Sequence, residues 1–164
     1  MRPTLTGLLV CALALSGASA LAHADPAPLP LVSLTTIPDG WSQRTDLRPI
    51  LQVFADGKAV HMPDAVSKDR KPETAPKQVS GKVDADVISA ALEEINALAE
   101  TDFGMPAGDN RGTQIIDLMP DDPTGEAHLV IYSPEASDGL NPEQKAARKR
   151  FTDLYKKLVD AFKS

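Results

Sequence analysis

The chain has little of several residue types on which protein chemistry often depends. It has one cysteine, Cys11, and three histidines among 164 residues, and aromatic side chains make up only 4% of it. Basic residues are also fewer than acidic ones, with 17 Lys and Arg against 23 Asp and Glu, which argues against nucleic acid as a partner. With one Trp, two Tyr and four Phe, little is left for a small-molecule groove once the core is filled.

Long apolar runs are missing too, except at the N-terminus. Met1-Arg2 is followed by an apolar stretch from Leu5 to Leu21 and then by Ala22-His23-Ala24. A charged start, an apolar middle and a small-x-small ending are typical of a secretory signal peptide. We therefore predict that residues 1–24 are removed and that the mature protein, beginning at Asp25, is secreted or otherwise extracytoplasmic. Cys11 would leave with this segment, which excludes thiol catalysis and cysteine-ligated metals.

Three alternatives to this N-terminus stay open. Cleavage after Ala20 also satisfies the small-x-small rule, so the chain could begin at Leu21. Lipidation of Cys11 is a second, although Val10 is bulkier than the residue that this processing prefers. Retention as an anchor is a third, because about 18 apolar residues can span a bilayer. Several Gly, Ser and Thr residues weaken that reading, and after signal removal we expect no transmembrane helix.

The rest of the chain is long enough for one core and too short for two. We expect a Pro-rich lead-in and first strand over 25–46 and a globular α+β domain over 47–164, with 31–46 belonging to the same domain. Signal removal takes away Arg2 and no acidic residue, so the mature chain is more acidic than the formal net charge of −6. That charge favours solubility.

Alternating apolar residues and turn signals predict an antiparallel sheet of five to six strands. The expected strands are Leu31–Ile37, Ile50–Phe54, Lys58–Met62, Gln78–Val83 (the least certain pattern), Thr113–Met119 and Ala127–Ser133. Asp56-Gly57 is a strong hairpin signal, and as a two-residue turn it fixes a register. That register pairs Ala55 with Lys58, Val53 with Val60 and Leu51 with Met62 on a mostly apolar face, and Phe54 with Ala59 and Gln52 with His61 on the other.

Two helices complete the predicted fold. Asp84 caps the first, and Asn141, Pro142 and Gln144 start the second with a capping box. Apolar residues at helical spacing predict that both helices pack on one face of the sheet. The expected stripes are Ile88, Ala91, Leu92, Ile95 and Ala99, and then Phe151, Leu154, Tyr155, Leu158, Val159 and Phe162.

Three segments carry a resemblance to a known group of proteins. Phe54–Val60 has an aromatic-x-Asp-Gly-Lys pattern, Asp102–Pro106 contains Phe-Gly-Met-Pro, and Gly139–Arg148 contains Gly-Leu-Asn-Pro-Glu-Gln. In this order they resemble exported proteins and lipoproteins of high-GC Gram-positive bacteria, over roughly residues 47–160. Those proteins have Arg where this chain has Lys58, and Thr where it has Asn141. The shared motifs are turns and caps, so the resemblance implies a shared fold and carries over no functional residue.

The strongest candidate for catalysis is a pair of residues in the second hairpin. In one of the two possible registers of 113–133, Asp117 lies opposite His128, which could form the dyad of a small hydrolase with Ser133 or Thr113 nearby. No nucleophile-elbow sequence accompanies the pair. We therefore expect a non-enzymatic protein and keep the hydrolase as an alternative.

Two metal-binding patterns are weak. Asp117, Asp121, Asp122 and Glu126 surround one loop, but their spacing does not match a dedicated calcium loop. Asp102-Phe103-Gly104 spells the metal-binding motif of protein kinases without the other kinase motifs, so we interpret it as a helix exit with Phe103 in the core. We expect no metal and no cofactor.

The last candidate is a basic stripe on the second helix. Lys145, Lys149, Lys156 and Lys163 could bind an anionic surface or an acidic envelope protein, or they could form a solvated face with internal pairs such as Asp153–Lys157. The leading hypothesis is an exported, non-enzymatic interaction protein of the cell envelope. A binding module for a wall-associated small molecule is a further alternative. The sequence leaves the oligomeric state open.

Overall fold

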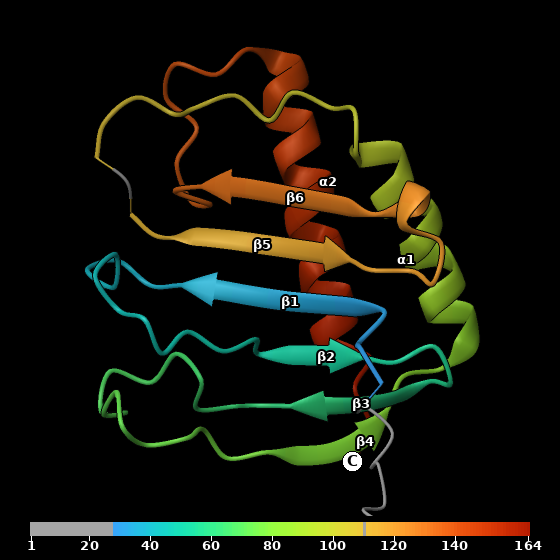
Figure 1. The fold of residues 1–164 in the computed structure, drawn as a ribbon. Helices are drawn as coiled ribbons and strands as arrows, with labels where there is room; N and C mark the ends of the chain where they lie inside the picture. Colours follow the sequence, from blue (N-terminus) through green and yellow to red (C-terminus); the bar gives the residue numbers. More distant parts are fainter. Residues whose placement is uncertain (1–27, 110) are drawn as a thin grey trace, which may run out of the picture.

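The computed structural model describes residues 28–109 and 111–164, so the predicted signal peptide lies outside the described residues. The described chain forms one open antiparallel sheet of six strands, in the order β4-β3-β2-β1-β5-β6, with two helices behind it (Figure 1). The α+β prediction is confirmed. The elements are β1 (Val32–Ile37), β2 (Leu51–Val53), β3 (Lys58–His61), β4 (Val79–Lys82), α1 (Ala85–Leu98), β5 (Thr113–Leu118), the 3-10 turn η1 (Pro123–Gly125), β6 (Ala127–Tyr132) and α2 (Pro142–Asp160).

The two faces of the sheet differ because successive strand residues point to opposite sides. One face packs on the helices and forms the core. Its strand residues, all buried, are Val32, Leu34, Leu51, Val53, Ile116, Leu118, Leu129 and Ile131. The opposite face, which we call the open face, carries no helix (Figure 1). By the strand pairing it presents Ser33, Thr35, Gln52, Val60, Ser80, Ile115, Asp117, His128 and Val130.

Helix α2 begins as the sequence predicts. The Asn141 side chain accepts a hydrogen bond from the Gln144 backbone N–H (2.8 Å), and Gln144 Oε1 accepts one from the Asn141 N–H (3.1 Å). Its apolar stripe is buried on the core, and the Tyr155 hydroxyl lies 2.9 Å from Thr36 Oγ1 on β1. Burial raises the pKa of Tyr155. The predicted docking of this helix on the sheet is therefore confirmed.

Helix α1 agrees with the prediction except at its two ends. Asp84 stands at the N-cap position, but its side chain caps no backbone N–H and pairs with Lys163 instead. Leu98, not Ala99, completes the buried stripe, because Ala99 is exposed after the last helical turn. Glu94 of α1 forms an ion pair with Arg150 of α2 (2.7 Å).

The predicted register of the first hairpin is wrong by one residue. Val53 pairs with Ala59, Gln52 with Val60 and Leu51 with His61. The Gly57 N–H donates to the Phe54 carbonyl (3.0 Å) and the Phe54 N–H to the Lys58 carbonyl (2.8 Å). The connection is thus a turn followed by a left-handed glycine bulge, with Gly57 at φ 83°, rather than a two-residue turn. The extra residue moves Val60 onto the open face.

Replacing Gly57 by valine is expected to lower the free energy of unfolding by about 1–2 kcal/mol, because an L-residue is strained at positive φ. A Cβ there would also lie 3.2 Å from the Val83 carbonyl oxygen. Urea melts measure the loss. Gly40→Val introduces the same backbone strain, at φ 78°, but a Cβ there meets nothing within 4 Å, so the difference between the two variants measures the contact with Val83. Equal stability of wild type and Gly57→Val would contradict this turn.

Candidate functional site

The structure adopts the register of the second hairpin that brings Asp117 and His128 together. They are paired residues of β5 and β6, and His128 Nδ1 lies 2.5 Å from Asp117 Oδ1. The His128 side chain is 65% exposed, so this contact is made in water on the open face. An exposed pair of this kind contributes little to stability.

None of the expected nucleophiles joins this pair. Thr113 is four residues from Asp117 along β5, and Ser133 is five from His128, which at the rise of a strand is about 13 Å and about 16 Å. Ser33 lies opposite Asp117 on β1 but is two strands, about 10 Å, from His128. A base needs its nucleophile within hydrogen-bond reach. The geometry therefore gives the hydrolase alternative no nucleophile among these three residues.

The other histidine of the globular domain belongs to the core side. The corrected register places His61 opposite Leu51 on the helix-covered face, where its ring lies 5.2 Å from that of Phe162. The predicted pairing of His61 with Gln52 on the opposite face is therefore wrong. The Asp102–Gly104 segment is a helix exit: Phe103 packs against Phe151 with ring centroids 5.7 Å apart, and Gly104 turns the chain at φ 59°.

The acidic residues at the tip of the β5–β6 hairpin are not gathered around one point. Asp122 Oδ1 accepts hydrogen bonds from the Thr124 N–H (3.0 Å) and hydroxyl (2.8 Å), which lower the pKa of its carboxyl group. Asp121 and Glu126 are exposed and form no ion pair with any residue that the structure describes. Within 28–109 and 111–164, no three His, Cys, Asp or Glu side chains are placed to hold a metal ion together.

The predicted basic stripe of α2 has fewer unpaired lysines than its sequence suggests. Lys149 pairs with Asp153 and Lys156 with Asp160, each at 2.5 Å, so Asp153 does not pair with Lys157. Lys163 lies beyond the end of the helix, where its backbone bridges Lys82 of β4 and its side chain pairs with Asp84. Lys145 forms no ion pair within the described chain. Binding of an anionic surface here stays a prediction.

Arg148 is a structural residue of α2 that was not among the candidates from the sequence. Its side chain is buried and donates to the carbonyl oxygens of Tyr132 (2.5 Å) and Ser133 (2.8 Å) at the end of β6. Burial lowers the pKa of this guanidinium. Its position three residues before Phe151 puts it on the buried stripe, a signal available in the sequence.

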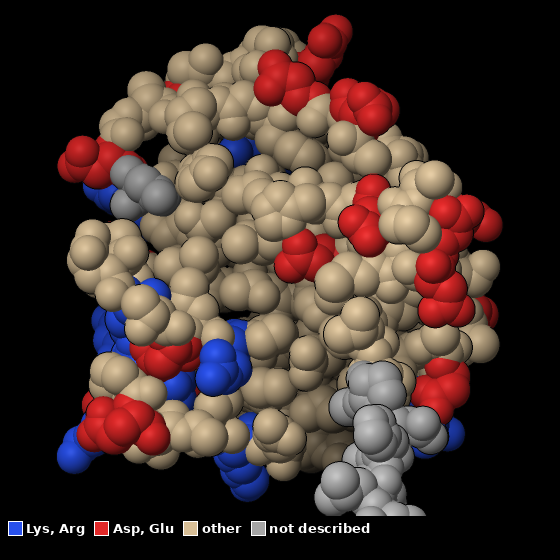
Figure 2. All heavy atoms as spheres, in the orientation of Figure 1, with Lys and Arg blue, Asp and Glu red and all other residues tan. Residues whose placement is uncertain are grey.

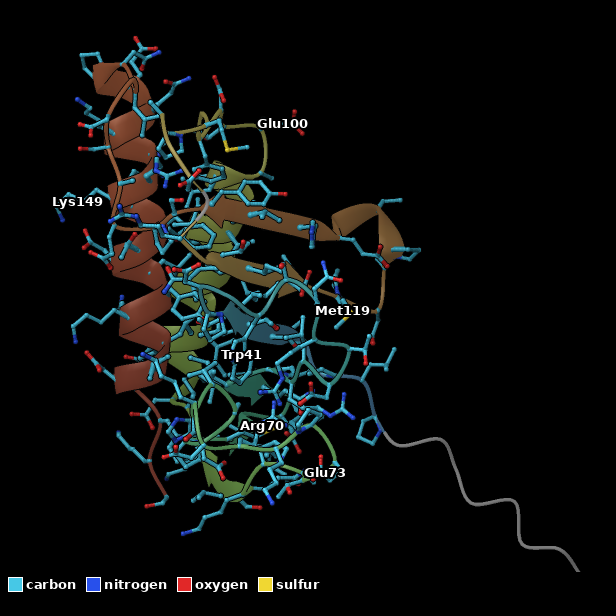
Figure 3. All side chains as sticks on the ribbon, turned by 90° about the vertical axis from the view of Figure 1, so that its left-hand side faces the viewer. Trp41, Arg70, Glu73, Glu100, Met119 and Lys149 are labelled. Atoms are coloured by element: carbon cyan, nitrogen blue, oxygen red, sulfur yellow. The ribbon has the colours of Figure 1, made fainter. Side chains whose placement is uncertain are left out.

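A second group that the sequence did not reveal lies at the loop edge of the sheet. Trp41 is buried beneath Arg44, whose Cζ lies 3.8 Å from the indole centroid, and beside Arg70 at 5.6 Å. Asp46 pairs with both arginines, at 2.5 Å to Arg44 and 2.8 Å to Arg70. We call these four residues the Trp41 cluster; Figure 3 labels two of them where the loops before β2 and after β3 meet.

The Trp41 cluster anchors the long loop after β3. Arg70 donates to the carbonyl oxygens of Ala65 (3.0 Å), Thr74 (3.1 Å) and Asp46 (3.2 Å), so one buried side chain ties two loops together. Hydrogen bonding to Arg44 holds the pKa of Asp46 well below its usual range. The loop between β3 and β4 is therefore anchored from within.

A groove with a volume of about 1010 Å³ lies on the open face. Open-face residues of β3 and β4, including Val60 and Ser80, lie along it, and the lead-in, the β2–β3 turn and the β5–β6 tip complete it. Its apolar walls include Leu29, Phe54 and Met119. Phe54 is the only aromatic among the described residues that line it, in keeping with the few aromatic residues of the chain, and the rest of its apolar lining comes from aliphatic side chains and prolines.

The open face is poor in charge. Figure 2 shows a broad area with few charged side chains, and acidic groups gathered on the side of the β5–β6 tip. Figure 3 places Met119 beyond this face and Lys149 on the outer side of α2, so the groove and the basic stripe lie on opposite sides of the molecule.

No protein-family model matches the chain, and no curated protein is similar to it. The resemblance to exported Gram-positive proteins therefore stays a prediction. No helix in the described part of the chain is both long and apolar enough to cross a membrane. The site has to be interpreted from its geometry.

Proposed function

We propose that this chain is an exported, non-enzymatic interaction protein of the cell envelope, and that it binds its partner through the open face of the sheet. The observation that carries the proposal is the apolar groove of about 1010 Å³ on that face. The signal-peptide pattern of residues 1–24 supports export.

The composition of the open face supports binding. The exposed face of an antiparallel sheet ordinarily carries polar side chains. Here Val60, Ile115 and Val130 interrupt the polar residues and are half-buried without a covering helix, and Leu29 at the groove is 78% exposed. Exposed apolar groups on the uncovered face of a sheet, beside an apolar groove, favour an interaction site there.

The rival readings have weaker geometric support. A hydrolase would need a nucleophile beside His128, and Thr113, Ser133 and Ser33 all lie too far away. An interface on the basic stripe would rely on four lysines, of which three are already paired with aspartates. A small-molecule site is compatible with the groove in volume, which stands at the upper end of the usual range of roughly 300–1,000 Å³.

The proposal that the protein is exported predicts the mass of its mature form. The exported protein is expected to begin at Asp25, because Ala22-His23-Ala24 satisfies the small-x-small rule. Intact-mass measurement of the envelope fraction tests this. A mass that includes residues 1–24, or a diacylglycerol on Cys11, would contradict it.

The binding surface is tested by cross-linking and capture from intact envelopes. Val60→Lys places a charge in the groove and is expected to abolish stoichiometric capture of a partner, because an unpaired charge in an apolar contact must be desolvated. Lys149→Glu with Lys156→Glu changes the opposite side of the molecule and should leave capture intact. Thermal melts confirm that both variants fold. Loss of capture in the α2 variant alone would assign the interface to α2 and overturn the proposal.

A further inference from the structure

We infer that the groove binds an extended, apolar polypeptide segment of the partner, and that a basic residue of this segment lies against the acidic β5–β6 tip. The inference rests on the proposed function, since it specifies what the open face binds. Its evidence is the distribution of apolar and charged groups around the groove.

The apolar part of the groove faces solvent. Leu29 is 78% exposed and Met119 36% exposed, and they lie on different segments that line the same groove with Val60. Burying such side chains removes apolar area from water, at about 25 cal/mol for each Å². A ligand with apolar groups along its length would therefore gain binding free energy by burying all three side chains.

The charges around the groove are unequally distributed. Asp56 and Lys58 form an ion pair at 2.6 Å near the β2–β3 turn, so that end is locally neutral. At the other end, Asp121 and Glu126 line the groove and form no ion pair with any described residue. Nearby positive charge on a ligand would complement these two carboxylates.

This charge pattern selects among the possible occupants. A second copy of the chain is disfavoured, because the protein has a formal net charge of −6 and an acidic groove rim. An anionic lipid surface or wall polymer is disfavoured for the same reason. Lys82 lies opposite Lys58 on the open face but outside the groove lining, so it does not offset the charge at the tip.

The form of the groove favours a polypeptide over a small ligand. Small-molecule sites bury most of the ligand surface, whereas this groove is open to solvent and is lined by residues from four separate parts of the chain. An extended segment alternates its side chains, so apolar residues can face the groove while polar ones face water.

The test is a calorimetric titration of the exported chain with a blocked short peptide of alternating leucine and serine that has lysine at both ends. A matched peptide has glutamate in place of lysine. The lysine peptide is expected to bind more tightly. Leu29→Ser, and separately Asp121→Asn with Glu126→Gln, should each weaken binding roughly 5-fold, as for about 1 kcal/mol of lost contact. Asp69→Asn with Glu93→Gln makes the same charge change away from the groove and should leave affinity unchanged.

The outcomes separate this inference from the proposed function. Equal binding of the glutamate peptide, or unchanged affinity in the Asp121→Asn/Glu126→Gln variant, would contradict the claim that a basic residue of the partner lies against the acidic tip. No binding of the lysine peptide to the wild type would overturn the inference, while capture that depends on Val60 would still support the proposed function. Groove-dependent peptide binding with capture insensitive to Val60→Lys would support the inferred chemistry and overturn the proposed function. The residues substituted for the peptide titration are all exposed and Val60 is half-buried, so the variants should fold, and thermal melts verify this.

Discussion

Replacing Arg70 by alanine is expected to lower the free energy of unfolding by about 2–4 kcal/mol, because the carbonyl groups that it binds lose their donor at about 1–3 kcal/mol each, while Asp46 keeps its ion pair with Arg44. The Arg70 side chain is 3% exposed and lies 2.8 Å from Asp46. Its loss would leave the carbonyl groups of Ala65 and Thr74 without their donor. Unsatisfied polar groups inside a protein are costly. Both loops at this edge of the sheet would loosen.

Urea melts followed by circular dichroism measure this loss, and the near-ultraviolet signal of Trp41 reports on the cluster itself. Lys71→Ala is the matched control, because Lys71 is exposed one position further along the same loop. It should change stability by less than about 0.5 kcal/mol. A similar, small change in both variants would show that the Trp41 cluster does not hold the loops.

Leu158→Ala is expected to lower the free energy of unfolding by about 2–5 kcal/mol, through lost burial and the cavity left behind. Leu158 is 1% exposed and belongs to the core between α2 and the sheet. Lys156→Ala, two residues earlier on the outer side of the same helix, is the control and should change stability by less than about 0.5 kcal/mol. Chemical denaturation of the two variants compares them. A small effect of Leu158→Ala would mean that α2 does not dock as described.

Local patterns in the sequence were sufficient to predict the elements and the layers. The period-2 strands, the helical stripes and the Asn141 capping box all depend on residues close together in the chain, and each is present. The register of the first hairpin could not be predicted in the same way. Asp-Gly suits both a two-residue turn and a turn with a left-handed bulge, and only the hydrogen bonds around Gly57 distinguish them.

The features that were missed depend on residues far apart in the chain. Trp41 and Asp46 lie in the loop before β2 and Arg70 in the loop after β3, and no local spacing predicts that the two loops meet. The groove arises in the same way, because Leu29, Val60 and Met119 become neighbours only when the sheet has formed. By contrast, the Asp117–His128 pair was one of two registers open at the sequence level, and the structure selects it.

The most direct measurement is site-specific photo-crosslinking in intact envelopes. A photoreactive amino acid is placed at Ser80, which is exposed and lines the groove, or at Ala146, which is exposed on α2. If the open face binds the partner, the Ser80 probe will form one dominant crosslinked product and the Ala146 probe will not. Crosslinking from Ala146 with none from Ser80 would contradict binding through the open face.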